Sequence, residues 1–155
     1  MFKKIILILL IAISASNIFG GGFQLNEHGA RAMGMAGAFT GLANDPSAIY
    51  FNPAGITQLS GINFYAGVTL IVPKASFRGP SPAIDEFKVK DRIFNPINFY
   101  ATYQFSDKLY FGLGVNNQYG LGTEWEDNWV GRELAVKTEL QSFYFTPVVA
   151  YKVLD

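Results

Sequence analysis

Cysteine is absent from this chain, and charged residues are scarce. The absence of cysteine excludes a disulfide framework, a thiol nucleophile and a metal site with thiolate ligands. Charged residues make up 15% of the sequence, whereas an average soluble domain has about 25%. The 12 basic and 12 acidic side chains cancel, so the chain lacks the excess positive charge that would predict a nucleic-acid partner. So little charge is typical of a protein much of whose surface faces lipid.

Patterns typical of catalysis are also lacking. The chain has one histidine, His28, with no evident serine–aspartate arrangement and no G-x-S-x-G sequence. A lone histidine beside Glu27 is more often a structural hydrogen-bonding group than a catalyst. The glycines at 34, 37 and 41 are not followed by Gly-Lys-Ser/Thr, so they do not predict a phosphate loop. We therefore expect a protein that is not an enzyme and that holds no metal ion and no other cofactor.

The apolar run at the N-terminus is short. Lys3 and Lys4 precede the apolar residues 5–13, and small residues follow as far as Gly20. A transmembrane helix needs about 20 apolar residues, so this run is too short to be an anchor. A basic start, a short apolar run and small residues in that order predict a signal peptide over residues 1–20. We therefore expect the chain to be exported.

Three later stretches alternate apolar and polar residues with period two. They cover residues 62–72, 97–105 and 109–115. A less regular fourth stretch at 137–153 contains Pro147, which predicts a bulge or distortion there. Alternation places the apolar side chains on one face of each strand and the polar ones on the other. In an exported chain with aromatic residues on the apolar face, this pattern predicts an all-β fold, a transmembrane antiparallel β-barrel with a polar lumen.

The connections between these strands alternate in length. A long segment at 73–96 is followed by a tight turn at 106–108 and then by a second long segment at 118–136. Outer-membrane barrels have long extracellular loops and short periplasmic turns, so the two long segments are predicted to lie outside the cell. Before the first strand, residues 21–61 are rich in glycine and alanine and predict a compact plug, or hatch.

Four strands are too few to close a barrel. Bacterial single-chain barrels have eight or more strands. An open edge in hydrocarbon costs several kcal/mol for each unpaired backbone group. We therefore expect residues 62–155 to form the first strands of a larger barrel, and the remaining strands to be required for the wall to close.

Two short motifs carry a family resemblance. The sequence Gly-Phe-Gln-Leu-Asn-Glu at 22–27, followed by Asn-Pro-Ala-Gly at 52–55, resembles the start of the FadL-type long-chain fatty acid transporters. Residues 117–125 resemble the stretch in which the third strand of that family is kinked before a long loop. The resemblance extends over the mature chain. It implies a barrel of about fourteen strands, of which this sequence supplies the hatch and about the first four.

The resemblance also implies a route for an apolar ligand. Outer loops capture the ligand, the hatch controls its passage, and it leaves sideways through a gap in the wall. Phe23 and Leu25 are the implied ligand contacts in the hatch. In the second long loop, apolar residues exposed among charged ones favour a binding groove, formed by Trp125, Trp129 and Leu134. An aromatic girdle, or packing within the loop, explains these three residues equally well.

The resemblance places a gate between the hatch and the kinked strand. Its implied members are Asn26, Glu27, Asn52, Pro53 and Ala54 in the hatch, and Asn117, Tyr119 and Gly120 at the kink. Asn52 can donate and accept hydrogen bonds, so it is expected to satisfy backbone groups that the kink leaves unpaired. Gly120 allows the backbone to leave strand geometry. The alternative is that Asn-Pro-Ala-Gly is only a turn that ends the hatch.

The sequence thus predicts transport of long-chain fatty acids or other hydrophobic small molecules across the outer membrane of a Gram-negative-type bacterium. The expected partners are a hydrophobic ligand and outer-membrane lipid. A paralogue that imports aromatic hydrocarbons fits the same residues. A structural or adhesive barrel without transport would not need the hatch start and the kink motif that are present here. A truncated fragment that cannot close its wall and has no function is the remaining alternative.

Overall fold

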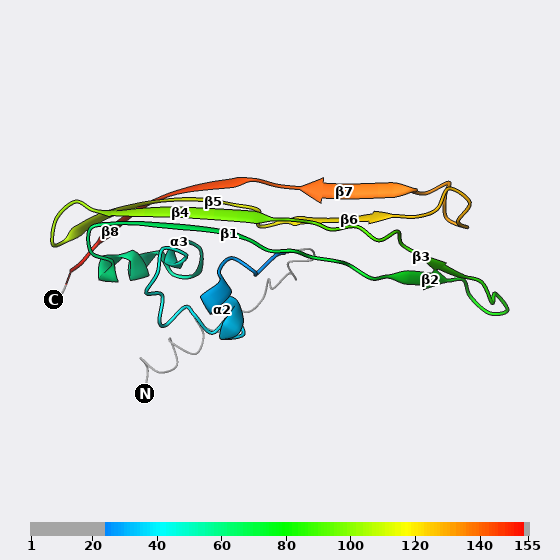
Figure 1. Cartoon of the computed structure of the whole chain (residues 1–155), viewed down its shortest axis with the longest axis horizontal. Helices are drawn as coiled ribbons and strands as arrows, with labels where there is room; N and C mark the ends of the chain where they lie inside the picture. Colours follow the sequence, from blue (N-terminus) through cyan, green and yellow to red (C-terminus); the bar gives the residue numbers. More distant parts are fainter. Residues whose placement is uncertain (1–23, 154–155) are drawn as a thin grey trace, which may run out of the picture.

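The computed structural model describes residues 24–153, so the predicted signal peptide and Phe23 lie outside the described residues. An elongated sheet carries the hatch, here residues 24–61, on one face, and two hairpins extend from one end of the sheet (Figure 1). Within the described range, none of the helices has the length and apolar character needed to cross a bilayer.

The sheet has four antiparallel strands in the order β1-β4-β5-β8. They are β1 (Ile62–Val68), β4 (Ile97–Gln104), β5 (Leu109–Asn116) and β8 (Tyr144–Tyr151). The tight turn predicted at 106–108 joins β4 to β5. The three regularly alternating stretches therefore form neighbouring strands, because β1 pairs with β4 and β4 pairs with β5.

The two faces of this sheet are used in the opposite way from a soluble sheet. The large apolar side chains that point away from the hatch are exposed: Ile62, Phe64, Val68, Ile97, Phe99, Tyr103, Phe111, Leu113, Phe145, Val149 and Tyr151. On the other face, Asn98, Tyr100, Thr102, Tyr110 and Asn116 are buried. A soluble antiparallel sheet buries its apolar face and solvates its polar one. This reversal is the one predicted for a wall with lipid outside and a polar lumen inside.

The two distal hairpins correct several predicted boundaries. The first long segment contains β2 (Ser76–Arg78) and β3 (Glu86–Lys88), which pair with each other. The second long segment is not a loop throughout, because β6 (Gly120–Glu124) begins within it and pairs with β7 (Lys137–Gln141). The fourth predicted strand is therefore divided into β7 and β8.

The break in the fourth strand does not lie at the proline. Pro147 stays in register opposite Leu113, and the strand is interrupted instead at Ser142 and Phe143. A strand tolerates proline at a position where the N–H that proline lacks does not face its paired neighbour. The predicted bulge at Pro147 is therefore wrong, and the distortion lies five residues earlier.

The hatch consists of short helical turns packed with small residues. Its elements are α2 (Ala30–Gly34), α3 (Ala48–Phe51) and the 3₁₀-helix η1 (Pro53–Gln58). Its backbone segments cross closely, since a Cβ on Gly55 would lie 2.3 Å from the carbonyl oxygen of Ala43. The buried core joins the hatch to the wall and contains Ala32, Phe39, Ala43, Ala48, Ile49, Ile56, Tyr100, Tyr110 and Ala150.

Ile49 sits in a notch in the wall that two glycines form. A Cβ on Gly112 would lie 2.9 Å from Ile49 Cδ1, and a Cβ on Gly114 would lie 2.8 Å from Ile49 Cγ2. Both distances are far below van der Waals contact, so a larger residue at either position would displace the hatch. The polar-face positions of β5 are thus shaped to hold α3 against the wall.

Candidate functional site

The third strand is interrupted where the kink was expected. β5 ends at Asn116 and β6 begins at Gly120. At the interruption the backbone N–H of Asn117 donates to the carbonyl of Ile97 at 3.3 Å, while Asn117 Oδ1 accepts from the N–H of Ile97 at 2.9 Å. The side-chain oxygen of Asn117 therefore replaces the backbone carbonyl that regular pairing with β4 would have supplied.

Ser142 satisfies the kink from the side of the fourth strand. Its carbonyl accepts from Asn117 Nδ2 at 2.6 Å, and its Oγ donates to the carbonyl of Tyr119 at 2.6 Å and accepts from the Tyr119 N–H at 3.0 Å. The sequence did not indicate Ser142 as a site residue. The available signal was the lost alternation at 142–143, which coincides with the break between β7 and β8.

The first described residues of the hatch pair with the kink. Gln24 forms an antiparallel bridge with Tyr119, and the N–H of Leu25 donates to the carbonyl of Gln118 at 2.8 Å. Leu25 is 8% exposed, and its Cδ1 would lie 3.7 Å from a Cβ on Gly120. The start of the hatch therefore acts as a short extra strand that covers the kink from within.

A small cavity, which we call the wall opening, lies between the segment that precedes β4 and the interruption between β5 and β6. It has a volume of about 170 Å³ and is lined by Leu25, Arg92, Ile93, Phe94, Asn95, Pro96, Asn117, Tyr119, Gly120, Glu139, Leu140 and Gln141. Pro96 has no N–H, so it requires no backbone acceptor from the third strand, and its carbonyl accepts from Thr69 at 3.0 Å. Pro96 therefore leaves no backbone donor unpaired beside the cavity.

A larger cavity, which we call the hatch cavity, lies on the inner face of the sheet. Its volume is about 890 Å³, within the range of about 300–1,000 Å³ that is usual for small-molecule sites. The residues that line it are Gln24, Asn26, Glu27, Ala32, Met33, Ala36, Gly37, Ile49, Tyr50, Phe51, Gln118 and Thr146. Asn26 and Glu27, which were expected in the gate, thus line the hatch cavity. Leu25, the residue before them, lines the wall opening instead.

Tyr50 and His28 hold the start of the hatch in place. The Tyr50 hydroxyl accepts from Gln24 Nε2 at 3.2 Å and lies 3.3 Å from the carbonyl of Leu25. The ring of His28 packs on Tyr50 at 4.0 Å between centroids, and His28 is 2% exposed. Burial lowers the pKa of His28, although a hydrogen bond to the backbone of Leu25 and the carboxylate of Glu27 oppose this shift. A neutral, packed imidazole fits the structural role expected from the sequence.

The Asn-Pro-Ala motif contributes within the hatch. Asn52 Nδ2 donates to the carbonyl of Thr40 at 3.0 Å, and Pro53 begins η1, which packs on β5 and β8. Ala54 is exposed. The hydrogen bond of Asn52 thus joins two turns of the hatch. The expected contact between Asn52 and the kink is not formed. Asn117 and Ser142 instead supply the hydrogen-bond partners at the kink.

The tryptophans of the second long segment pack the distal hairpins together. The rings of Trp125 and Trp129 stack at 4.4 Å with an angle of 12° between planes, and Phe77 of β2 meets Trp129 edge-on at 5.9 Å. Trp129 is 9% exposed and its Nε1 donates to the carbonyl of Ala135 at 2.9 Å. Leu134 is 90% exposed and stands apart from this cluster. This arrangement matches the loop-packing alternative and does not join the three residues in one groove.

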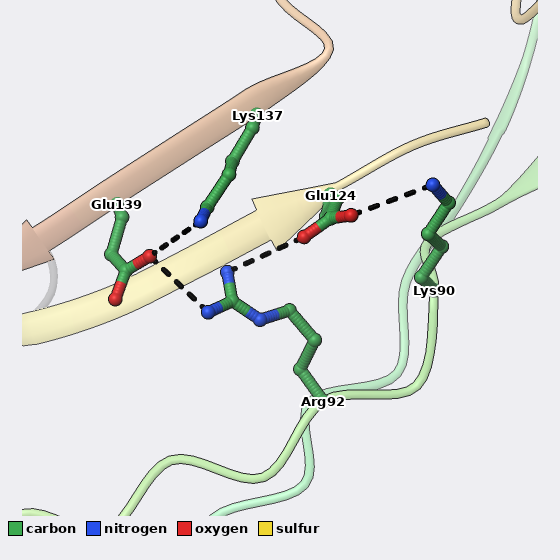
Figure 2. Close-up of polar contacts among 5 residues, drawn as sticks. All are labelled: Lys90, Arg92, Glu124, Lys137 and Glu139. Carbon is green, nitrogen blue, oxygen red and sulfur yellow. Dashed lines mark hydrogen bonds and ion pairs between the residues drawn. The ribbon is translucent and has the colours of Figure 1, made fainter. Parts of the chain in front are cut away.

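An ion-pair network joins the segment between β3 and β4 to the β6–β7 hairpin, as Figure 2 shows. Arg92 lies between two carboxylates, with Nη2 donating to Glu139 Oε2 at 3.2 Å and Nη1 lying 3.7 Å from Glu124 Oε2. Lys90 pairs with Glu124 at 3.4 Å, and Lys137 pairs with Glu139 at 3.3 Å. No sequence motif indicates these residues. The available signal is the spacing of two between Lys90 and Arg92 and between Lys137 and Glu139, which is typical of one face of a strand.

Comparison with known proteins covers nearly the whole chain. Residues 11–155 match the family described as "Outer membrane protein transport protein (OMPP1/FadL/TodX)". The chain is 29% identical over 157 residues to the long-chain fatty acid transport protein of Salmonella typhi, covering 99% of this chain and 36% of that protein. It is 27% identical over 145 residues to the 47 kDa outer membrane protein of Pasteurella multocida, covering 93% and 34%. The chain thus spans about a third of the length of these relatives.

The fold has a solved counterpart. A crystal structure of a Pseudomonas aeruginosa FadL homologue superposes with a TM-score of 0.50 at 22% identity, covering 72% of this chain and 30% of that one. At this identity the likeness concerns the fold. The four-stranded sheet is part of an outer-membrane β-barrel, as the alternation of apolar and polar residues predicts. Together with the family match over residues 11–155, this shows that the chain belongs to the OMPP1/FadL/TodX family of outer-membrane transport proteins.

Proposed function

We propose that this chain takes part in the uptake of long-chain fatty acids or other hydrophobic small molecules, held in the hatch cavity and released sideways through the wall opening. One observation carries the proposal. The start of the hatch serves both cavities, because Gln24, Asn26 and Glu27 line the hatch cavity while Leu25 lines the wall opening. A shift of this one segment would empty the first site and unblock the second.

Lateral release fits the physical chemistry of an acyl chain. Each methylene group favours hydrocarbon over water by about 0.8 kcal/mol, so a ligand that leaves into the bilayer avoids the free-energy cost of exposing its chain to water. A gap in a β-wall is costly unless its backbone groups find other partners. Asn117 and Ser142 supply those partners with their side chains, so the gap can persist in the resting structure.

The gate proposed here is weakly held. The hydrogen bond from Leu25 to Gln118 and the bridge from Gln24 to Tyr119 attach the start of the hatch to the kink. Each hydrogen bond contributes about 0.5–1.5 kcal/mol net, which the burial of two methylene groups of a ligand can offset. Occupation of the hatch cavity could therefore displace Leu25 from the wall opening.

The Salmonella relative, named for long-chain fatty acid transport, supports an acyl ligand. A neutral hydrocarbon is the second candidate. Among the described residues that line the hatch cavity, the charged side chain is Glu27, an acid. A carboxylate side chain in the lining disfavours the binding of a ligand carboxylate through like-charge repulsion, but it does not repel a neutral hydrocarbon.

The proposal is tested by locking the gate. Cysteines at Gln24 and Tyr119, which face each other in an antiparallel bridge, are positioned to form a disulfide, and the chain has no other cysteine. In the complete barrel, the oxidised pair should reduce oleate uptake by cells at least tenfold, and a reductant should restore it. Cysteines at the paired wall residues Asn63 and Thr102 serve as the control. Equal uptake by the oxidised and reduced forms of the gate pair would refute lateral release past Leu25.

A further inference from the structure

We propose that Arg92 recognises the ionised head group of an amphiphilic ligand at the wall opening, a carboxylate in the case of a fatty acid. The proposal rests on the lateral release proposed above and adds a residue that selects among ligands. It is drawn from the position of Arg92 in the ion-pair network of Figure 2.

The wall opening is lined by both apolar and charged side chains. Leu25, Phe94 and Leu140 contribute apolar side chains to its lining, and Ile93 is 69% exposed. Arg92 and Glu139 are the ionised groups among its described lining residues. The guanidinium of Arg92 lies over the ring of Phe94, 5.1 Å from the ring centroid. Apolar walls with a cation at one end match a ligand that has a hydrocarbon chain and an anionic head.

Arg92 has unused capacity to donate hydrogen bonds. Its Nη2 donates to Glu139, whereas the buried Nη1 makes no hydrogen bond within the described part of the chain. The nearest carboxylate oxygen to Nη1 is that of Glu124, at 3.7 Å, which is outside hydrogen-bond range. Buried donors are seldom left without an acceptor. A ligand carboxylate would supply one, and guanidinium suits this because its planar fork matches carboxylate geometry.

The neighbouring ion pairs allow Arg92 to change partners. Glu124 also pairs with Lys90 at 3.4 Å, and Glu139 also pairs with Lys137 at 3.3 Å. Each carboxylate would therefore retain a cationic partner if Arg92 turned away. Glu126, 3.9 Å from Lys90, is the remaining acid at this end of the network. No carboxylate of the network is therefore stranded without a cation when Arg92 binds a ligand. An isolated Arg–Glu pair would not permit this exchange, because breaking it would leave one charge alone.

The volume of the wall opening indicates when Arg92 acts. At about 170 Å³ it is smaller than the roughly 300–1,000 Å³ of sites that store small molecules. The opening is therefore too small to store a ligand, so in this proposal it contacts the ligand only during release. Arg92 would hold the head group while the chain enters the bilayer, so its effect should appear in the rate of transfer and in the preference for charged ligands.

The test compares two ligands that differ only in charge. Uptake of oleate and of methyl oleate is measured in cells that carry the complete barrel with Arg92→Gln. We expect oleate uptake to fall about tenfold and methyl oleate uptake to stay within about twofold. Arg92→Lys should restore part of the oleate uptake, because it returns the charge without the fork. Arg78→Gln is the matched control, since it removes one charge from an exposed pair with Glu86 in the β2–β3 hairpin.

Two outcomes would overturn the proposal. An equal decrease in the uptake of both ligands would show that Arg92 only holds the segment between β3 and β4 against the β6–β7 hairpin. Unchanged uptake of both would show that the ion pairs have no part in transport. Failure of the gate lock at Gln24 and Tyr119 would instead refute lateral release itself, so the two proposals fail separately.

Discussion

At the residue scale, the notable feature is how a few polar side chains stabilise an interruption in a lipid-facing wall. Asn117 offers an oxygen to Ile97 and an amide to Ser142, and Ser142 bonds both backbone groups of Tyr119. In a bilayer, water cannot replace such partners. These two residues therefore supply partners for backbone groups that the interruption of the third strand would otherwise leave unpaired.

The hydroxyl of Ser142 should matter for stability. Ser142→Ala leaves the N–H of Tyr119 without its acceptor and removes one donor to the Tyr119 carbonyl. We expect a loss of about 1–3 kcal/mol in the free energy of unfolding of the complete barrel, measured by denaturant unfolding in detergent. Ser142→Thr, which retains the hydroxyl, should lose much less. Equal stability of Ser142→Ala and the unaltered protein would contradict this role.

At the scale of elements, the hatch is seated by shape as well as by hydrogen bonds. Ile49 of α3 enters the notch formed by Gly112 and Gly114, next to Tyr100. Glycine in a strand is unfavourable for the strand itself, because it loses backbone freedom and offers no side chain to pack. Its presence at two alternate positions is explained by the close approach of the hatch.

Filling this notch should displace the hatch and leave the wall intact. In Gly114→Val the new Cβ would lie 2.8 Å from Ile49 Cγ2, which is too close for van der Waals contact. Valine itself is favourable in a strand. We expect the barrel to assemble but the hatch to become sensitive to added protease, with a loss of about 1–3 kcal/mol from overpacking. Adding Ile49→Ala should recover part of the protection, because it vacates the space.

Gly41→Ala provides the control for this experiment, since a Cβ at that hatch position meets nothing within 4 Å. It should leave protease resistance unchanged. If Gly114→Val resisted protease as well as Gly41→Ala does, the notch would not be what seats the hatch.

At the scale of the whole molecule, the sheet has an apolar outer face and two edges. Phe64 and Phe145 are 70% and 71% exposed on that face, and β1 and β8 form the edges of the described sheet. An exposed apolar face and unpaired strand edges both promote association in water. The relatives are about three times as long as this chain, which fits a wall that needs further strands.

A polypeptide limited to these 155 residues should therefore aggregate when expressed alone. The expected result is recovery in the insoluble fraction, or high-mass species by light scattering after refolding in buffer without detergent. A soluble, monodisperse monomer would refute the interpretation of the outer face and the edges. Co-expression with the remaining strands of a relative should return the chain to the membrane fraction.

The sequence by itself determined the three regularly alternating strands, the two faces of the wall and the turn at 106–108. These features depend on local periodicity and on short motifs, which a single chain displays directly. It also led to the family through the motifs at 22–27 and 52–55.

Only the tertiary structure decided which distant residues meet. Arg92 reaches Glu139 across 47 positions, and Asn117 reaches Ser142 across 25. Asn52, expected at the kink, bonds Thr40 in the hatch, and Trp125 stacks on Trp129 instead of standing open in a groove. Periodicity specifies the face on which a side chain lies and not its partner on another strand. That choice is made by strand register and by the bend of the third and fourth strands, which put these residues side by side.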